Sequence, residues 1–334
     1  MQNAPQDPKG FRPKAFPPPQ FPPHRPRRFA RMPPAVFPAI LGLLGLGLLL
    51  RRAVVALTLP PALADILLGA MVALWAFAAF GLAVKISRRP AVVLEDLKTL
   101  PGRAGFAAAV LGLYLSVAAI APFAPALGKA LLVVGMALQA ALAARTLWVW
   151  MKAPPEAREI TPVWHLTFVG FIVAALAALP LGWTGLANVL FWITLPVALA
   201  IWGVSAVQLI RRIPPAPLRP LLAIHLAPAS LLATVGAGVG QTGLALGMLA
   251  LAALIAVALV ATGRWITEAG FTALWGAFTF PLSAFGSALF VLGFDVSGTL
   301  VLIGALGVIP WIGYRVMKLW AGGQLAVKTN AAEA

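Results

Sequence analysis

The sequence contains no cysteine and few charged residues. Without cysteine, disulfides and thiolate metal sites are excluded, and the redox compartment stays open. Only 10% of the 334 residues are charged, whereas a soluble globular protein carries about a quarter. Hydrophobic residues make up 61% of the chain. A chain of this composition would precipitate in water, so the composition predicts an all-α polytopic membrane protein.

Patterns that signal catalysis are also missing. The chain has no nucleophile–base pair with enzyme spacing, no P-loop and no dinucleotide fingerprint, and its glycine-rich pieces at 42–47 and 236–240 lie within or at the end of apolar segments. Its three histidines, at positions 24, 165 and 225, are too scattered along the sequence for a metal site. We therefore expect no enzyme activity, no metal and no cofactor.

The net charge of +16 does not indicate nucleic-acid binding. The basic residues do not form a continuous face. They sit in an N-terminal tail and in alternate loops, a distribution typical of membrane orientation. The prediction is that nucleic acid is not a partner.

Residues 1–33 form a separate proline-rich region with seven basic residues. Proline disfavours a helix, and the segment has no apolar residues to build a core, which predicts a disordered tail. Its basic end suits anionic lipid headgroups. An SH3-like partner for the proline-rich part is an alternative to a plain solvated tether. More than thirty polar residues precede the first apolar run, which argues against a signal peptide.

From residue 34 to 321, apolar segments of membrane-spanning length recur, and residues 322–334 form a short second tail. About ten transmembrane helices are expected, at 35–50, 61–84, 104–121, 128–150, 163–181, 185–210, 219–239, 243–262, 271–292 and 297–319.

Basic residues follow the even-numbered spans, whereas the loops at 180–185, 240–243 and 293–298 are nearly free of charge. The positive-inside rule therefore places both termini in the cytoplasm, as expected for a protein of the bacterial inner membrane. Arg51, Arg52 and Lys129 are exceptions to the pattern.

Consecutive spans form five tandem helical hairpins whose two members differ. The odd-numbered spans carry stripes of small residues and several prolines, while the even-numbered spans are mostly apolar all round. A helix with one face of small residues is suited to border a narrow space, whereas a helix that is apolar on all sides can face lipid. This difference predicts an inner ring of five odd-numbered helices around a central pore, with five even-numbered helices outside. Gln139, Gln208 and Asn188, on even-numbered spans, are expected to hold helices together.

The ninth span has two unlike faces when it is wound as a helix. One face carries bulky side chains, and the other carries small or hydroxylated residues interrupted by Phe280. Pro281 removes a helical hydrogen bond and is expected to kink the backbone. The pattern is typical of a narrow pore with a plug. The alternative is a small-residue stripe that only packs helices.

Several motifs together resemble the tellurite-resistance/dicarboxylate transporter family, which includes the bacterial TehA proteins and the plant guard-cell slow anion channels. They are Phe37-Pro38-Ala39-Ile40-Leu41-Gly42-Leu43-Leu44-Gly45-Leu46-Gly47-Leu48, Thr161-Pro162-Val163-Trp164 with Val169-Gly170, Leu218-Arg219-Pro220 with Leu226-Ala227-Pro228, and Trp275-Gly276-Ala277-Phe278-Thr279-Phe280-Pro281-Leu282.

The resemblance covers residues 35–320 and implies five hairpins around a pore, assembled as a homotrimer with one pore per subunit. It matches the gating aromatic of the family to Phe280. His165, His225 and Leu274 depart from the pattern of the family, which puts the substrate preference in doubt more than the architecture.

We therefore expect a pore gate at Phe280 and Pro281. The expected pore lining is Gly276, Ser283, Ser287, Gly112, Ser116, Gly170, Thr167, Pro228, His225 and His165. The spans as drawn contain almost no interior acid or base, so permeation should be passive or coupled through histidine. An anion path without fixed cations would rely on helix-end dipoles, hydroxyls and backbone groups.

The function expected from these features is an anion channel or facilitative transporter. The sequence does not distinguish among monovalent inorganic anions, C4-dicarboxylates, sulfite and tellurite as the transported small anions. The alternative is a non-transporting membrane scaffold.

Overall fold

The computed structural model describes residues 27–154 and 158–334, and its regular elements are helices. In this part of the chain, nine helices are long and apolar enough to cross a membrane, and the segment His165–Leu181 is a shorter apolar helix at the place of the fifth predicted span. The nine are Pro34–Ala56, Ala62–Arg88, Leu100–Ile120, Pro125–Lys152, Thr184–Arg211, Ala216–Gly238, Thr242–Ala261, Ala273–Val291 and Asp295–Ala321. The expected all-helical membrane fold is confirmed.

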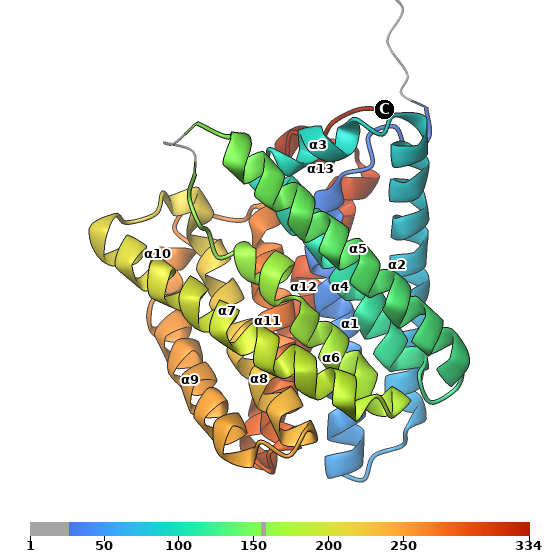
Figure 1. Ribbon diagram of the computed structural model, residues 1–334, viewed down its shortest axis with the longest axis vertical. Coiled ribbons are helices and arrows are strands. Elements are labelled where there is room, and N and C mark those ends of the chain that lie inside the picture. Colours follow the sequence, from blue (N-terminus) through green and yellow to red (C-terminus); the bar gives the residue numbers. More distant parts are fainter. Residues whose placement is uncertain (1–26, 155–157) are drawn as a thin grey trace, which may run out of the picture.

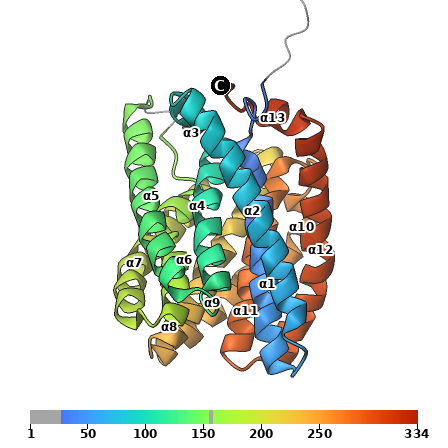
Figure 2. The ribbon, with the colours of Figure 1, turned by 90° about the vertical axis from the view of Figure 1, so that its right-hand side faces the viewer.

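The elements in chain order are η1 (Pro34–Val36), α1 (Phe37–Ala56), α2 (Ala62–Arg88), α3 (Val92–Leu97), α4 (Leu100–Ile120), α5 (Pro125–Lys152), η3 (His165–Val169), α6 (Phe171–Ala178), η4 (Leu179–Leu181), α7 (Thr184–Arg211), η5 (Ala216–His225), α8 (Leu226–Gly238), α9 (Thr242–Ala261), α10 (Gly263–Ile266), η6 (Ala273–Trp275), α11 (Gly276–Val291), α12 (Asp295–Ala321) and α13 (Gln324–Lys328). In Figures 1 and 2, α3, α13 and the C-terminus lie at one end of the bundle, here named the termini end. The other end is named the far end.

The odd-numbered spans form a closed inner ring. Contacts run from α1 to α4, α6, α8 and α11 in turn, and α11 contacts α1 again. In the most apolar window of the four long inner spans, 61–78% of the residues are buried, against 17–33% in the outer spans. The outer helices thus present apolar side chains outward, as a lipid-facing layer requires. This arrangement is the inner ring that the sequence predicts.

Glycines on α1 let α11 approach closely. A Cβ on Gly42 would lie 2.0 Å from Thr279 Oγ1, and a Cβ on Gly45 would lie 2.2 Å from Ser283 Oγ. The Thr279 hydroxyl lies within hydrogen-bond distance of the carbonyls of Pro38 (3.1 Å) and of Gly276 (2.8 Å). The small residues at these positions therefore fix the position of α11 against α1, and with it the side chain of Phe280.

The fifth span is irregular, because it opens with the π-helical turn η3 before α6 begins. A π-helical turn leaves carbonyls without their usual partners, and such groups must be satisfied inside a membrane. Gln139 Nε2 on α5 donates to the carbonyls of Leu166 (3.0 Å) and Thr167 (2.6 Å). The expected role in holding helices together is confirmed for Gln139, whereas the side chains of Gln208 and Asn188 make no hydrogen bond to the described residues.

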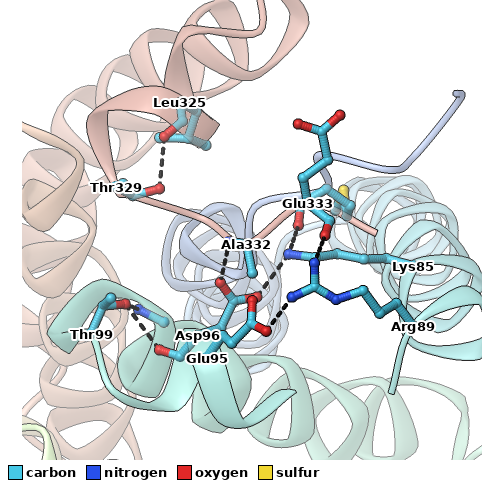
Figure 3. Close-up of polar contacts among 11 residues, drawn as sticks. Lys85, Arg89, Glu95, Asp96, Thr99, Leu325, Thr329, Ala332 and Glu333 are labelled. Atoms are coloured by element: carbon cyan, nitrogen blue, oxygen red, sulfur yellow. Dashed lines mark hydrogen bonds and ion pairs between the residues drawn. The ribbon is translucent and has the colours of Figure 1, made fainter. Parts of the chain in front are cut away.

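At the termini end, the two ends of the described chain pack against the bundle (Figure 3). Lys85 Nζ lies 2.7 Å from Asp96 Oδ2 and donates to the Met32 carbonyl at 3.0 Å. The backbone N–H of Ala332 donates to Asp96 Oδ1 at 2.7 Å. Ala30 and Met32 are buried. Residues 27–33 are thus ordered, although they fall within the segment predicted to be disordered. Residues 1–26 lie outside the described residues.

Candidate functional site

A large cavity lies at the far end of the inner ring. Its volume is about 570 Å³. Every inner span contributes to its wall, with Leu48 from α1, Leu115 from α4, Leu176 from α6, Leu231 from α8 and Ser287 from α11. The cavity therefore lies on the axis of the ring.

Two much smaller cavities lie toward the termini end. The first, about 30 Å³, is also lined by all five inner spans, including Pro38, Ala104, Leu166, Leu221 and Ala277. The second, about 10 Å³, lies between α4, η3, α6, η5, α8 and α11. Spaces of this size hold little more than water. The axis of the ring is thus open at the far end and nearly closed at the termini end.

Phe280 lies where the three cavities meet. Of the described residues, Phe280 alone lines all three. Its side chain is buried, with 4% of the residue exposed, and its Cδ2 lies 3.0 Å from the place where a Cβ on Gly45 would be. The ring of Phe280 therefore stands between the far-end cavity and the narrow space beyond it.

Most of the sequence-predicted lining residues border one of these spaces. Gly276 and Pro281 line the first small cavity, and Ser283 and Ser287 line the far-end cavity. The second small cavity is lined by Gly170, Pro228 and His165. Pro281 lies inside α11, which continues through it to Val291.

Four predicted lining residues, Gly112, Ser116, Thr167 and His225, do not border these cavities. The first three lie at contacts between helices. A Cβ on Gly112 would lie 2.5 Å from Trp75 Cδ1, so this glycine makes room for a side chain of the outer helix α2. Ser116 Oγ donates to the Gly112 carbonyl at 2.8 Å. Thr167 is buried, and its carbonyl accepts from Gln139.

His165 and His225, treated from the sequence as scattered, lie together in the structure. His165 Nε2 is 3.0 Å from His225 Nδ1, so one ring donates and the other accepts. The pair joins the fifth and seventh spans. His225 also lines a separate cavity of about 340 Å³ beside the termini end of α7. No third metal-ligating side chain joins them within the part of the chain that the structure describes.

Two arginines at the far-end cavity are absent from the predicted site. The first span is predicted to end at residue 50, but α1 continues to Ala56, so Arg51 and Arg52 lie within the helix and line the cavity. This corrects the expectation of a path without fixed cations. The signal in the sequence is that both residues break the positive-inside pattern.

Arg51 is held by neighbours on two other helices. Its Nη2 lies 2.8 Å from Asp65 Oδ1 on α2. Its Nη1 donates to the carbonyls of Ala118 (3.3 Å) and Ala119 (3.1 Å) at the end of α4. These contacts neutralise the charge of Arg51 and satisfy carbonyls that the helix end leaves without partners.

A closed ring of five helices with cavities along its axis, surrounded by five outward-facing apolar helices, defines a polytopic membrane protein of the channel and transporter class. Comparison with protein families sharpens this assignment. The model of the SLAC1 family, described as voltage-dependent anion channel, matches residues 31–316. The chain belongs to this family, and the resemblance found in its sequence is confirmed. Comparison with curated proteins finds no match.

Proposed function

We propose that the protein passes small anions along the axis of the inner ring and that Phe280 is the gate. The observation that carries this proposal is the position of Phe280 between the far-end cavity and the two small cavities. Movement of one aromatic ring, through a rotamer change or a shift of α11, would join these spaces. The structure then corresponds to the closed state.

The lack of carboxylates in the described residues of the inner spans favours permeation driven by the anion gradient alone. The five inner spans contain no aspartate or glutamate in their described residues. Proton-coupled transporters use carboxylates inside the membrane as relays. Among the described residues, the paired histidines are the one hydrogen bond between titratable side chains of two inner spans, so any proton coupling would use that pair.

The transported anion belongs to the group of monovalent inorganic anions, C4-dicarboxylates, sulfite and tellurite. The protein assembles as a homotrimer with one pathway per subunit in a bacterial inner membrane. Both termini face the cytoplasm, where basic residues near the N-terminus contact anionic headgroups. The protein carries no enzyme activity.

The experiment is anion flux through purified protein in proteoliposomes. Phe280→Ala removes the ring between the cavities and should raise the flux of chloride or nitrate several-fold above the wild-type level. Phe278→Ala is the matched control, because Phe278 lies two residues away in α11 and packs against Trp275, with ring centroids 5.6 Å apart. This variant should conduct as the wild type does.

The outcomes separate the candidate functions. Equal flux through Phe280→Ala and wild type would remove Phe280 from the gate. Absence of anion-dependent swelling with both proteins would instead favour the non-transporting scaffold.

A further inference from the structure

The far-end cavity holds one arginine whose charge is not neutralised by a neighbour. Arg51 is paired with Asp65. Arg52 also lines the cavity and is exposed. Within residues 27–154 and 158–334, its guanidinium makes no hydrogen bond or ion pair. Arg52 thus presents unused donors and a full positive charge to the cavity.

One hydroxyl in the same cavity is also free to donate. Thr234 Oγ1 donates to the Ser230 carbonyl at 3.0 Å, and Ser283 Oγ donates to the Phe280 carbonyl at 2.9 Å. Ser287, half-buried on α11, makes no hydrogen bond to the described residues. An anion in the cavity would therefore find donors on Arg52 and Ser287, on the far-end side of Phe280.

Asp295, in the first turn of α12, limits the charge that the cavity accepts. Asp295 lines the cavity, and its carboxylate forms no ion pair with the described residues. Together with the pair formed by Arg51 and Asp65, the four charges sum to zero. A monoanion bound beside Arg52 brings this sum to −1 and a dianion brings it to −2, so the second negative charge adds repulsion from Asp295.

We propose that the far-end cavity is an anion-binding vestibule in which Arg52 attracts the ion, Ser287 assists, and Asp295 selects singly charged anions over dianions. This inference rests on the proposed function and names the charge class of its substrate. Among the four classes of anion considered above, it favours the monovalent inorganic anions over the C4-dicarboxylates. Because Arg52 is exposed, its attraction should weaken as salt screens it.

The test measures flux in the Phe280→Ala background, where the gate is removed. Proteoliposomes are loaded with chloride or nitrate as singly charged probes and with sulfate or succinate as dianions. Arg52→Gln should lower chloride and nitrate flux about tenfold at low ionic strength, and the difference should shrink in high salt. Arg52→Lys should retain most of the flux. Asp295→Asn should raise the ratio of dianion flux to monovalent flux.

Lys129→Gln is the matched control. It removes a positive charge from the far end, where Lys129 lies over the ring of Trp183 at 5.7 Å and does not line the cavity. Its flux should equal that of the parent. Size-exclusion profiles of all variants should match, because neither the Arg52 nor the Asp295 side chain forms a hydrogen bond or ion pair with the described residues.

The inference and the proposed function fail in different ways. If the parent conducts anions but Arg52→Gln conducts equally well and Asp295→Asn leaves the dianion ratio unchanged, the vestibule site is wrong. Absence of flux through the Phe280→Ala parent would count against the pathway itself.

Discussion

At the scale of single residues, the contact between α1 and α11 depends on glycines that leave no space for a methyl group. Gly42→Ala would place a Cβ 2.0 Å from Thr279 Oγ1, inside van der Waals contact. Relieving that overlap must shift α11 or the Thr279 side chain, at a cost of about 1–3 kcal/mol. We expect a lower melting temperature in detergent for this variant.

The control for Gly42→Ala is Gly247→Ala on the outer helix α9. A Cβ on Gly247 meets no atom within 4 Å, and alanine favours a helix over glycine by about 0.5–1 kcal/mol. Gly247→Ala should therefore leave the melting temperature unchanged or raise it slightly. Equal melting temperatures for the two variants would show that α1 and α11 tolerate a wider separation than the structure has.

Residue patterns predict which side of a helix is special but not what lies against it. The two faces of the ninth span identified Phe280 together with Ser283 and Ser287, and all three line the far-end cavity. The same reasoning selected Gly112, which faces Trp75 of an outer helix. A small residue makes room equally well for a pore or for a bulky neighbour, and the sequence of one helix does not tell which.

At the scale of elements, the irregular start of the fifth span depends on a side chain from α5. Gln139→Ala would leave the carbonyls of Leu166 and Thr167 without their donor inside the protein. A buried carbonyl without a partner costs about 1–3 kcal/mol. We expect this variant to be destabilised in thermal unfolding and the fifth span to exchange its amide hydrogens faster.

Gln208→Ala is the comparison for Gln139→Ala. Gln208 lies on the outer helix α7, beside the 340 Å³ cavity, and its side chain makes no hydrogen bond to the described residues. Removing the Gln208 side chain should therefore change the unfolding temperature little. If both variants unfold at the same temperature, the π-helical turn does not need the Gln139 amide.

Element boundaries were predictable where the composition changes abruptly and less so where it does not. The spans and the inner ring follow from apolar length, stripes of small residues and loop charges. The end of α1 does not, because Arg51 and Arg52 resemble a loop in the sequence although the helix continues to Ala56. Within the helix, Arg51 is bound by Asp65 and by two carbonyls of α4. A hydropathy pattern does not reveal such contacts between the side chains of different helices.

At the scale of the whole molecule, the two ends of the bundle use charge differently. At the far end, Arg52 and Asp295 are left facing a cavity. At the termini end, Lys85 and Asp96 are paired and buried, with side chains 0% and 1% exposed. This pair ties α2 to α3, the Met32 carbonyl and the backbone of Ala332 (Figure 3). The far end thus keeps charged side chains beside a cavity, while at the termini end a buried ion pair holds the chain ends against the bundle.

The buried pair at the termini end yields a test of what holds the chain ends against the bundle. Asp96→Asn leaves Lys85 buried without a counter-charge, which should lower stability by about 3–5 kcal/mol. Lys85→Met combined with Asp96→Asn removes both charges, so the double variant should unfold closer to the wild type than Asp96→Asn does.

The control is Arg212→Gln, which breaks an ion pair with Glu159 at the surface. The two side chains are 77% and 59% exposed, so this change should lower stability by only about 0–1 kcal/mol. Thermal unfolding in detergent measures all three variants. Should Asp96→Asn prove as mild as Arg212→Gln, the chain ends are held at the termini end by apolar packing around Met32 rather than by the buried ion pair.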